Sequence, residues 1–118
     1  MDYIKAKPFK AAQNLLLTAV INSRVTEVIR LIEDGEADIN GQNVNGSTAL
    51  HAACQYKLDN VAKVLLDYGA DPSIKENLFV GGKSPIHLAV ENDCYNIVRM
   101  LLDKGCSPNV NDGFKNYP

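Results

Sequence analysis

The sequence predicts an all-α solenoid, in which helix-turn-helix repeats stack within a single domain of 118 residues. Three observations support this fold class: the chain resembles itself at a constant spacing, each copy contains two short segments with helical periodicity, and loops with turn-forming residues separate the copies. With 46% hydrophobic and 22% charged residues, the composition is that of one ordinary folded domain.

The internal similarity is clearest between a second and a third copy. Residues 50–53 (LHAA) match residues 86–89 (IHLA), and the match continues without a gap to Gly69 and Gly105. The spacing between these two copies is 36 residues. A match of this length is too extended to be a chance tetrapeptide, so it predicts two equivalent structural units.

A more diverged first copy opens the chain. A shift of 33 residues places Leu17 on Leu50 and Leu31 on Val64. Because each repeat buries its apolar face only against its neighbours, three copies predict one continuous solenoid that fills the chain. The repeats are expected at about residues 11–43, 44–79 and 80–112, with the start of a fourth at 113–118.

Each copy contains the elements of a helix pair. In the second copy, apolar residues at helical spacing predict helices over about residues 49–56 and 59–68. Thr48 and Ser84 are suitable N-caps, and Pro85 suits a first helical position. Helices this short are marginal on their own, so their stability must come from stacking one pair on the next.

Two loops between the pairs are expected to project as hairpin fingers. Residues 43–46 (NVNG) form the first and residues 79–82 (FVGG) the second, both with turn-forming residues. The second loop is longer by three residues, and its extra length carries Leu78, Phe79 and Val80. An apolar tip on an inserted loop is unusual.

The repeat motifs resemble those of the ankyrin family. Residues 48–51 (TALH) and 84–87 (SPIH) look like the ankyrin Thr-Pro-Leu-His motif, and residues 69–71 (GAD) look like its Gly-Ala-Asp ending. The resemblance extends from about Asn14 to the C-terminus and implies an ankyrin-repeat solenoid of about three repeats with projecting fingers.

The sequence departs from the ankyrin pattern at a few positions. With the 33-residue shift, Leu15 and Thr18 stand where the first copy would have its Thr and His. Lys57 and Asp93 occupy a position that is usually glycine. The first departure affects only the interior packing of that repeat.

The end of the chain coincides with the expected start of another repeat. Tyr117 and Pro118 align with the residues that begin the earlier first helices, so we expect an N-terminal piece of a longer array. The outer face of the third repeat, with some of Ile97, Met100 and Leu101, would then lack its neighbour. Terminal repeats need a polar outer face, so end-to-end self-association is expected.

The resemblance implies a partner-binding surface on the concave face, formed by the fingers and the first helices. Tyr56 and Phe79 are the leading candidates, because aromatic side chains contribute strongly to interfaces. Two alternatives stay open: Tyr56 as a solvated tyrosine at a helix end, and Phe79 buried by folding back of its loop. The matching positions are Val44, Asn45, Ser47, Gln55, Tyr56, Leu78, Phe79, Val80, Gly81, Lys83, Glu91 and Asn92.

The leading functional hypothesis is a protein-protein interaction module that binds a protein or peptide, with no catalytic activity and no cofactor. An alternative is a regulatory or substrate-docking segment of a larger enzyme whose catalytic domain lies beyond Pro118. A third is a structural spacer in a long solenoid, which predicts no partner sensitive to Tyr56 or Phe79. Fold alone does not decide among these hypotheses.

Composition argues against several other classes. The 12 basic and 14 acidic residues are interspersed, so no basic patch for nucleic acid is expected. The longest apolar run, residues 15–21, is far shorter than the roughly 20 residues of a membrane span, and no signal-peptide cleavage site follows it. Three cysteines without a close pair favour a reducing compartment, so an intracellular location, cytoplasmic or nuclear, is expected.

Catalytic and metal-binding patterns are weak. His51 and Cys54 have the spacing of neighbours on a helix, but His51 belongs to the repeat motif, and the equivalent His87 has Val90 three residues later. The histidines and cysteines lack the close spacing of structural zinc ligands. Residues 82–84 (GKS) imitate the end of a phosphate-binding loop without its earlier glycine.

One modification is suggested by the resemblance. In some ankyrin proteins the asparagine that follows the Gly-Ala-Asp loop is hydroxylated, and residues 38–40 (DIN) resemble that setting. Asn40 is therefore a candidate for hydroxylation.

Overall fold

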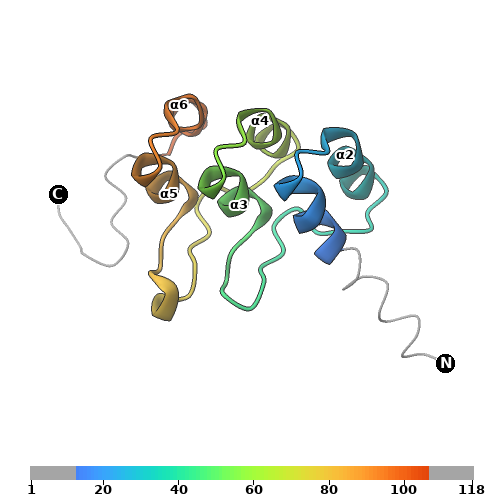
Figure 1. Ribbon diagram of the computed structural model, residues 1–118, viewed down its shortest axis with the longest axis horizontal. Coiled ribbons are helices and arrows are strands. Elements are labelled where there is room, and N and C mark those ends of the chain that lie inside the picture. The colour runs from blue at the N-terminus through green and yellow to red at the C-terminus, as the bar shows by residue number, and fades with distance from the viewer. Residues whose placement is uncertain (1–12, 107–118) are drawn as a thin grey trace.

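The computed structural model describes residues 13–106, which form stacked pairs of antiparallel helices with no strand among them (Figure 1). The first helix, residues 13–21, pairs with α2. α3 packs against α4 and α5, and α6 packs against α4 and α5. The predicted all-α solenoid is confirmed. The labelled helices are α2 (Val25–Glu33), α3 (Ala49–Gln55), α4 (Asp59–Asp67), the short 3-10 helix η1 (Leu78–Val80), α5 (Pro85–Glu91) and α6 (Tyr95–Asp103).

The helices form two layers, with the fingers projecting beyond one of them. Figure 1 shows α2, α4 and α6 in an outer layer, and the first helix, α3 and α5 in an inner layer from which the fingers extend downward. The hydrophobic core lies between the layers and continues from pair to pair. Its largest fully buried apolar side chains are Leu16, Leu31, Leu50, Leu65, Ile86, Ile97 and Leu101.

The inner helices of the second and third repeats begin with the predicted caps. At α3, the Thr48 hydroxyl oxygen accepts a hydrogen bond from the His51 amide, and the Thr48 amide donates to His51 Nδ1 at 3.0 Å. Ser84 and His87 make the same reciprocal pair at α5, with Pro85 at the start of that helix. The Thr-x-x-His spacing is therefore a capping box in which histidine takes the place of the usual glutamate.

The ends of the outer helices show the register of the repeats. The Gly35 amide donates to the Ile32 carbonyl, as the Gly69 amide donates to the Leu66 carbonyl, and both glycines have positive φ. These equivalent pairs lie 34 residues apart, so the helices of the first repeat align at 34 residues and the predicted 33-residue shift is wrong there. One additional residue, Glu36, follows Gly35 and restores the shorter spacing downstream.

The corrected register changes the equivalences in the first repeat. Leu16, and not Leu17, corresponds to Leu50, and both are fully buried. Asn14 and Leu17 therefore stand where the second repeat has Thr48 and His51. The sequence misled because residues 15–17 are all leucine, so a one-residue slip leaves the apolar pattern intact.

The turns inside the helix pairs have left-handed backbone at residues other than glycine. Lys57 and Asp93, the two departures from the usual glycine, have φ of 60° and 58°, and Ser23 has 58° in the first repeat. These three residues adopt the conformation that the family pattern implies, at the steric cost that a side chain brings to it.

The predicted outer face of the third repeat is wrong for two of its three residues. Ile97 and Leu101 are fully buried on the inner side of α6, and Met100 is partly buried against the core. The helical register of α6 places them there, because residues four apart lie on one face. Tyr117 and Pro118, the expected start of a fourth repeat, lie outside the described residues.

The two fingers are turns of different length that contact each other. In the first, the Asn43 amide donates to the Ser47 carbonyl at 2.9 Å. The second is closed by the Glu76 amide, which donates to the Lys83 carbonyl at 2.9 Å, and η1 forms its tip. The extra length of the second finger is thus an ordered helical turn.

Asn77 joins the fingers. Its amide nitrogen donates to the Asn45 carbonyl at 2.9 Å, and its side-chain Nδ2 donates to the Val44 carbonyl at 2.9 Å. Gly46 permits this close approach, because a Cβ there would lie 2.8 Å from the Asn77 backbone nitrogen. The tip of the second finger is therefore held against the first finger by backbone contact.

Gly46→Ala is expected to destabilise the fold more than Gly69→Ala. Both glycines have positive φ, but a Cβ at Gly69 would meet no atom within 4 Å. We expect a loss of about 1 kcal/mol for Gly69→Ala from backbone strain alone, and about 3 kcal/mol for Gly46→Ala. Urea unfolding measures both, and equal losses would contradict the proposed contact between the fingers.

Candidate functional site

A groove opens between the first two repeats on the side of the inner helices and the fingers. Its volume is about 320 Å³. It contains the predicted residues of the first finger and of the end of α3, together with Val80 from the second finger. The lining residues are Leu17, Ile21, Asn43, Asn45, Ser47, Thr48, His51, Ala52, Gln55, Tyr56, Glu76 and Val80.

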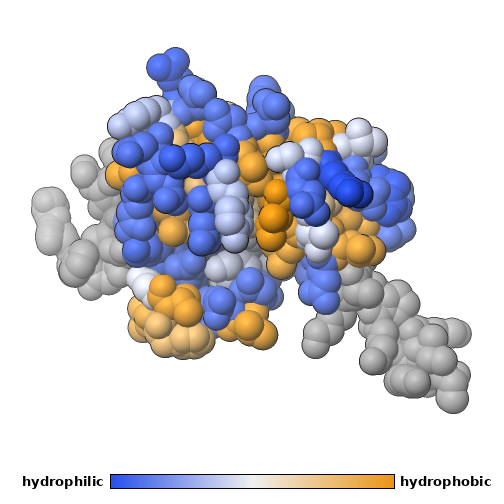
Figure 2. Space-filling model, in the orientation of Figure 1, coloured by the Kyte–Doolittle hydropathy of each residue, from blue (hydrophilic) through white to orange (hydrophobic). Residues whose placement is uncertain are grey.

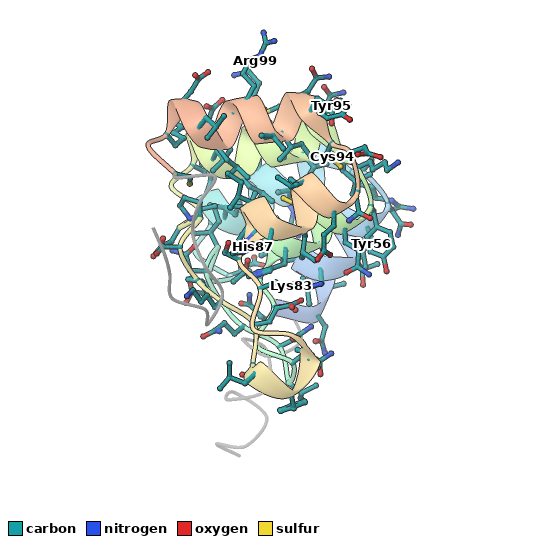
Figure 3. All side chains as sticks on the ribbon, turned by 90° about the vertical axis from the view of Figure 1, so that its left-hand side faces the viewer. Tyr56, Lys83, His87, Cys94, Tyr95 and Arg99 are labelled. Atoms are coloured by element: carbon teal, nitrogen blue, oxygen red, sulfur yellow. The ribbon has the colours of Figure 1, made fainter. Side chains whose placement is uncertain are left out.

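One side of the groove is apolar and accessible. Leu17 and Ile21 come from the first helix, and Tyr56, 52% exposed, follows the last residue of α3. Tyr56 is therefore at a helix end, as the alternative interpretation had it, and it also lines the groove. Figure 3 shows Tyr56 at the level of the inner helices, whereas Tyr95 lies on α6 in the outer layer.

His51 forms part of the groove's polar floor and connects two repeats. Its Nε2 lies 2.9 Å from the Lys83 carbonyl oxygen and donates to it, while Nδ1 accepts from the Thr48 amide. The ring is almost completely buried, and burial lowers the pKa of the His51 imidazole below its ordinary value. His51 is therefore a neutral structural ring near pH 7.

Cys54 does not form a nucleophilic pair with His51. Both ring nitrogens of His51 already have partners, and Cys54 is fully buried. Burial raises the pKa of the Cys54 thiol far above its ordinary value, which disfavours the reactive thiolate. Among residues 13–106, no three His, Cys, Asp or Glu side chains are grouped to hold a metal ion.

The charge lining the groove comes from Glu76. Its Oε2 accepts a hydrogen bond from the Ser47 hydroxyl at 3.2 Å, across the two fingers. The first helix, residues 13–21, carries no charged side chain, and neither do residues 39–56 of the first finger and α3. The groove is therefore neutral apart from one carboxylate.

The tip of the second finger is apolar and exposed. Phe79 is 78% exposed, with Leu78 beside it and Val80 partly exposed, and Val44 of the first finger is also exposed. Figure 2 shows this apolar region at the lower edge of the molecule, below α5. Of the two alternatives for Phe79, the structure therefore has the exposed ring and not the folded-back one.

The predicted residues near α5 make contacts within the protein. Lys83 Nζ and Glu91 Oε2 form an ion pair, and Figure 3 shows Lys83 below His87 on the finger side of α5. Asn92 Nδ2 donates to the Leu88 carbonyl at 2.9 Å at the end of that helix. The predicted surface thus has two parts, the groove and the apolar tip, with these three residues beside them.

Sequence reasoning missed several residues of this surface. Leu17 and Ile21 were assigned to the core of the first repeat, and Glu76 and Asn77 were treated as ordinary loop residues. The absence of charge over residues 39–56 was a readable sign of a neutral surface around Glu76. No local pattern indicates that Asn77 reaches Val44, because that contact depends on the stacking of two repeats.

Asn40 lies between repeats. Its Oδ1 accepts a hydrogen bond from the Asp71 amide at 2.8 Å, and its own amide donates to Asp38 Oδ1. The hydroxylation of Asn40 stays a prediction.

The stacked helix pairs, the Thr-x-x-His capping boxes and the projecting fingers define an ankyrin-type solenoid. The sequence profile of the family "Ankyrin repeats (3 copies)" matches residues 16–112. The chain therefore belongs to the ankyrin-repeat family, whose members are generally protein-protein interaction modules and typically non-catalytic. Within the described residues, no helix is long and apolar enough to cross a membrane.

Similar segments occur in proteins of varied architecture. Ankyrin repeat domain-containing protein 40 of Homo sapiens is 42% identical over 66 residues, which are 55% of this chain and 18% of that protein. An ankyrin repeat protein of Acanthamoeba polyphaga mimivirus is 37% identical over 72 residues, covering 61% and 44%. The mitochondrial disaggregase of Bos taurus is 40% identical over 62 residues, covering 52% and 9%. The matched segment is thus less than half of each of these relatives.

The lowered pKa of His51 predicts a pH-dependent stability. Below its ordinary value of 6.5, the unfolded chain binds a proton more readily than the folded one, so the contribution of His51 is present above that value and lost as pH falls. His51→Gln keeps an amide donor but does not titrate. We expect the free energy of unfolding to fall less in this variant than in the wild type between about pH 7.5 and about pH 5. Parallel losses in urea titrations would contradict this assignment.

Proposed function

We propose that this chain binds an extended segment of a partner protein in the groove between its first two repeats, with a second contact at the apolar finger tip. The groove presents apolar side chains beside unpaired surface for hydrogen bonds, and its volume of about 320 Å³ suits a few peptide side chains. Both parts lie on the side of the molecule that carries the fingers.

The observation that carries the proposal is the exposure of two aromatic rings on this one side. Tyr56 lines the groove, and Phe79 lies at the tip of a finger whose backbone is fixed through Asn77. Aromatic side chains dominate interface energies, and exposed apolar patches with a polar surround mark interaction sites. A fixed finger also loses little conformational entropy on binding.

A second candidate role is the docking segment of a larger enzyme. The similarity to a short part of the mitochondrial disaggregase, 9% of its length, is with a protein whose name denotes an activity. The groove and tip would then hold a substrate or another part of the same enzyme. The coding sequence beyond Pro118 distinguishes this role, since it requires a non-repeat domain there.

End-to-end self-association is a further proposal, now based on different residues. Val90 is 52% exposed and Leu102 is 41% exposed, whereas Cys54 and Leu66, their equivalents 36 residues earlier, are 0% and 5% exposed. The third repeat therefore presents apolar surface where the second repeat is covered by its neighbour. Head-to-tail contacts of this kind form open chains of molecules.

Leu102→Glu is expected to abolish concentration-dependent association in sedimentation experiments, because a charge would then have to be desolvated at the contact. Leu78→Glu is the matched control, since Leu78 is an exposed leucine on the finger tip, away from α6. An equal effect of both substitutions would contradict an end-to-end contact.

The binding proposal is tested with the Tyr56→Ala, Phe79→Ala double variant. A partner captured by the wild-type chain from native extract is purified, and its affinity for both chains is measured by calorimetry. We expect the double variant to bind about 10- to 100-fold more weakly, as removal of two aromatic contacts typically causes.

Tyr95→Ala is the matched control. Tyr95 is a more exposed tyrosine than Tyr56, but it lies on α6 in the outer layer (Figure 3). This variant is expected to bind like the wild type. If every captured partner binds all three chains equally, the proposed surface is wrong and the spacer hypothesis gains support.

A further inference from the structure

We infer that the groove selects a partner segment in which a lysine or arginine lies next to an aliphatic residue, with the cation at Glu76 and the aliphatic side chain against Leu17, Ile21 and Tyr56. This inference rests on the proposed function and names the chemistry of its ligand.

The charge distribution around the groove is the first argument. No charged side chain occurs in residues 13–21 or 39–56, which supply the first helix, the first finger and α3. His51, on the groove floor, is neutral because it is buried and donates to a carbonyl. The potential inside the groove is therefore set by the Glu76 carboxylate, and a cation is its complement.

The nearest cation of the same surface is neutralised by a different carboxylate. Lys83 pairs with Glu91 along α5. At the equivalent positions of the second repeat, 36 residues earlier, stand Ser47 and Gln55, which are too short to form such a bridge. The space that an ion pair spans beside the third repeat is thus open beside the second.

The position of Glu76 is fixed, which favours recognition. Its backbone amide donates to the Lys83 carbonyl, and its Oε2 accepts from the Ser47 hydroxyl. Within residues 13–106, no hydrogen bond reaches its other oxygen, Oε1. A carboxylate oxygen accepts more than one hydrogen bond, so Oε1 is available to the ammonium or guanidinium group of a ligand.

The apolar side of the groove accounts for the neighbouring aliphatic residue. Leu17, Ile21 and Val80 supply aliphatic surface, and Tyr56 supplies the face of a ring. Burying one leucine-sized side chain against such a surface contributes about 2 kcal/mol. A single exposed ion pair contributes less, so the aliphatic contact provides affinity and Glu76 provides selectivity.

The test is selection of a phage-displayed library of random peptides on the wild-type chain and on Glu76→Gln. Glutamine retains the acceptor for the Ser47 hydroxyl, so the fold is expected to persist, which circular dichroism verifies. We expect peptides selected on the wild type to be enriched in Lys or Arg beside Leu, Ile or Val. We expect peptides selected on the variant to keep the aliphatic residue and lose the basic one.

A synthetic peptide from the wild-type selection then measures the contact. Glu76→Gln should weaken its binding about 3- to 10-fold, and a Lys→Gln peptide should bind both chains equally, because the two changes remove the same interaction. Glu91→Gln, a carboxylate outside the groove, is the matched control and should bind as the wild type does. Added salt should reduce the affinity of the wild type more than that of Glu76→Gln.

The outcomes separate this inference from the proposed function. Selected peptides that lack basic residues, bind Glu76→Gln equally well and are lost with Tyr56→Ala would overturn the inference and leave the groove as a binding site. If no peptide whose binding depends on Tyr56 is selected, the proposed function fails, and the inference fails with it.

Discussion

The structure depends on the histidine of each capping box, and most clearly on His51. Its Nδ1 accepts from the Thr48 amide and so fixes the start of α3, while Nε2 donates to the Lys83 carbonyl of the next repeat. One buried ring therefore ends the finger, begins the helix and joins two repeats. Short helices without such contacts would be marginal, because each pair is stabilised mainly by its neighbours.

This link also places the interaction surface. The Lys83 carbonyl belongs to the strand-like arm that returns from the second finger, and the opposite arm holds Glu76, whose amide donates to the same carbonyl oxygen. The ring of His51 thereby sets the distance between α3 and the second finger, and with it the position of η1. The groove and the apolar tip are consequences of how one repeat is attached to the next.

Much of the fold could be predicted from the sequence, because its determinants are local. The capping residues Thr48 and Ser84, the helix ends at Gly69 and Gly105, and the periodic apolar residues between them act within a few positions. The register of the first repeat could not be predicted in this way. Three consecutive leucines satisfy two alignments, and only the hydrogen bonds at Gly35 distinguish them. The same limit explains the wrong assignment of Ile97 and Leu101, whose burial depends on the rotation of α6.

The site was predictable in its general location but not in its composition, because the groove is formed between repeats. Tyr56, Gln55 and Ser47 follow from their positions in the repeat, whereas Glu76 enters the groove from the following finger. The two later repeats also differ at equivalent positions: Lys83 and Glu91 form an ion pair where Ser47 and Gln55 leave open space. In a stack of nearly identical backbones, such substitutions decide which repeat interface closes on itself and which one stays accessible to a partner. Here that reasoning assigns recognition to the interface of the first and second repeats.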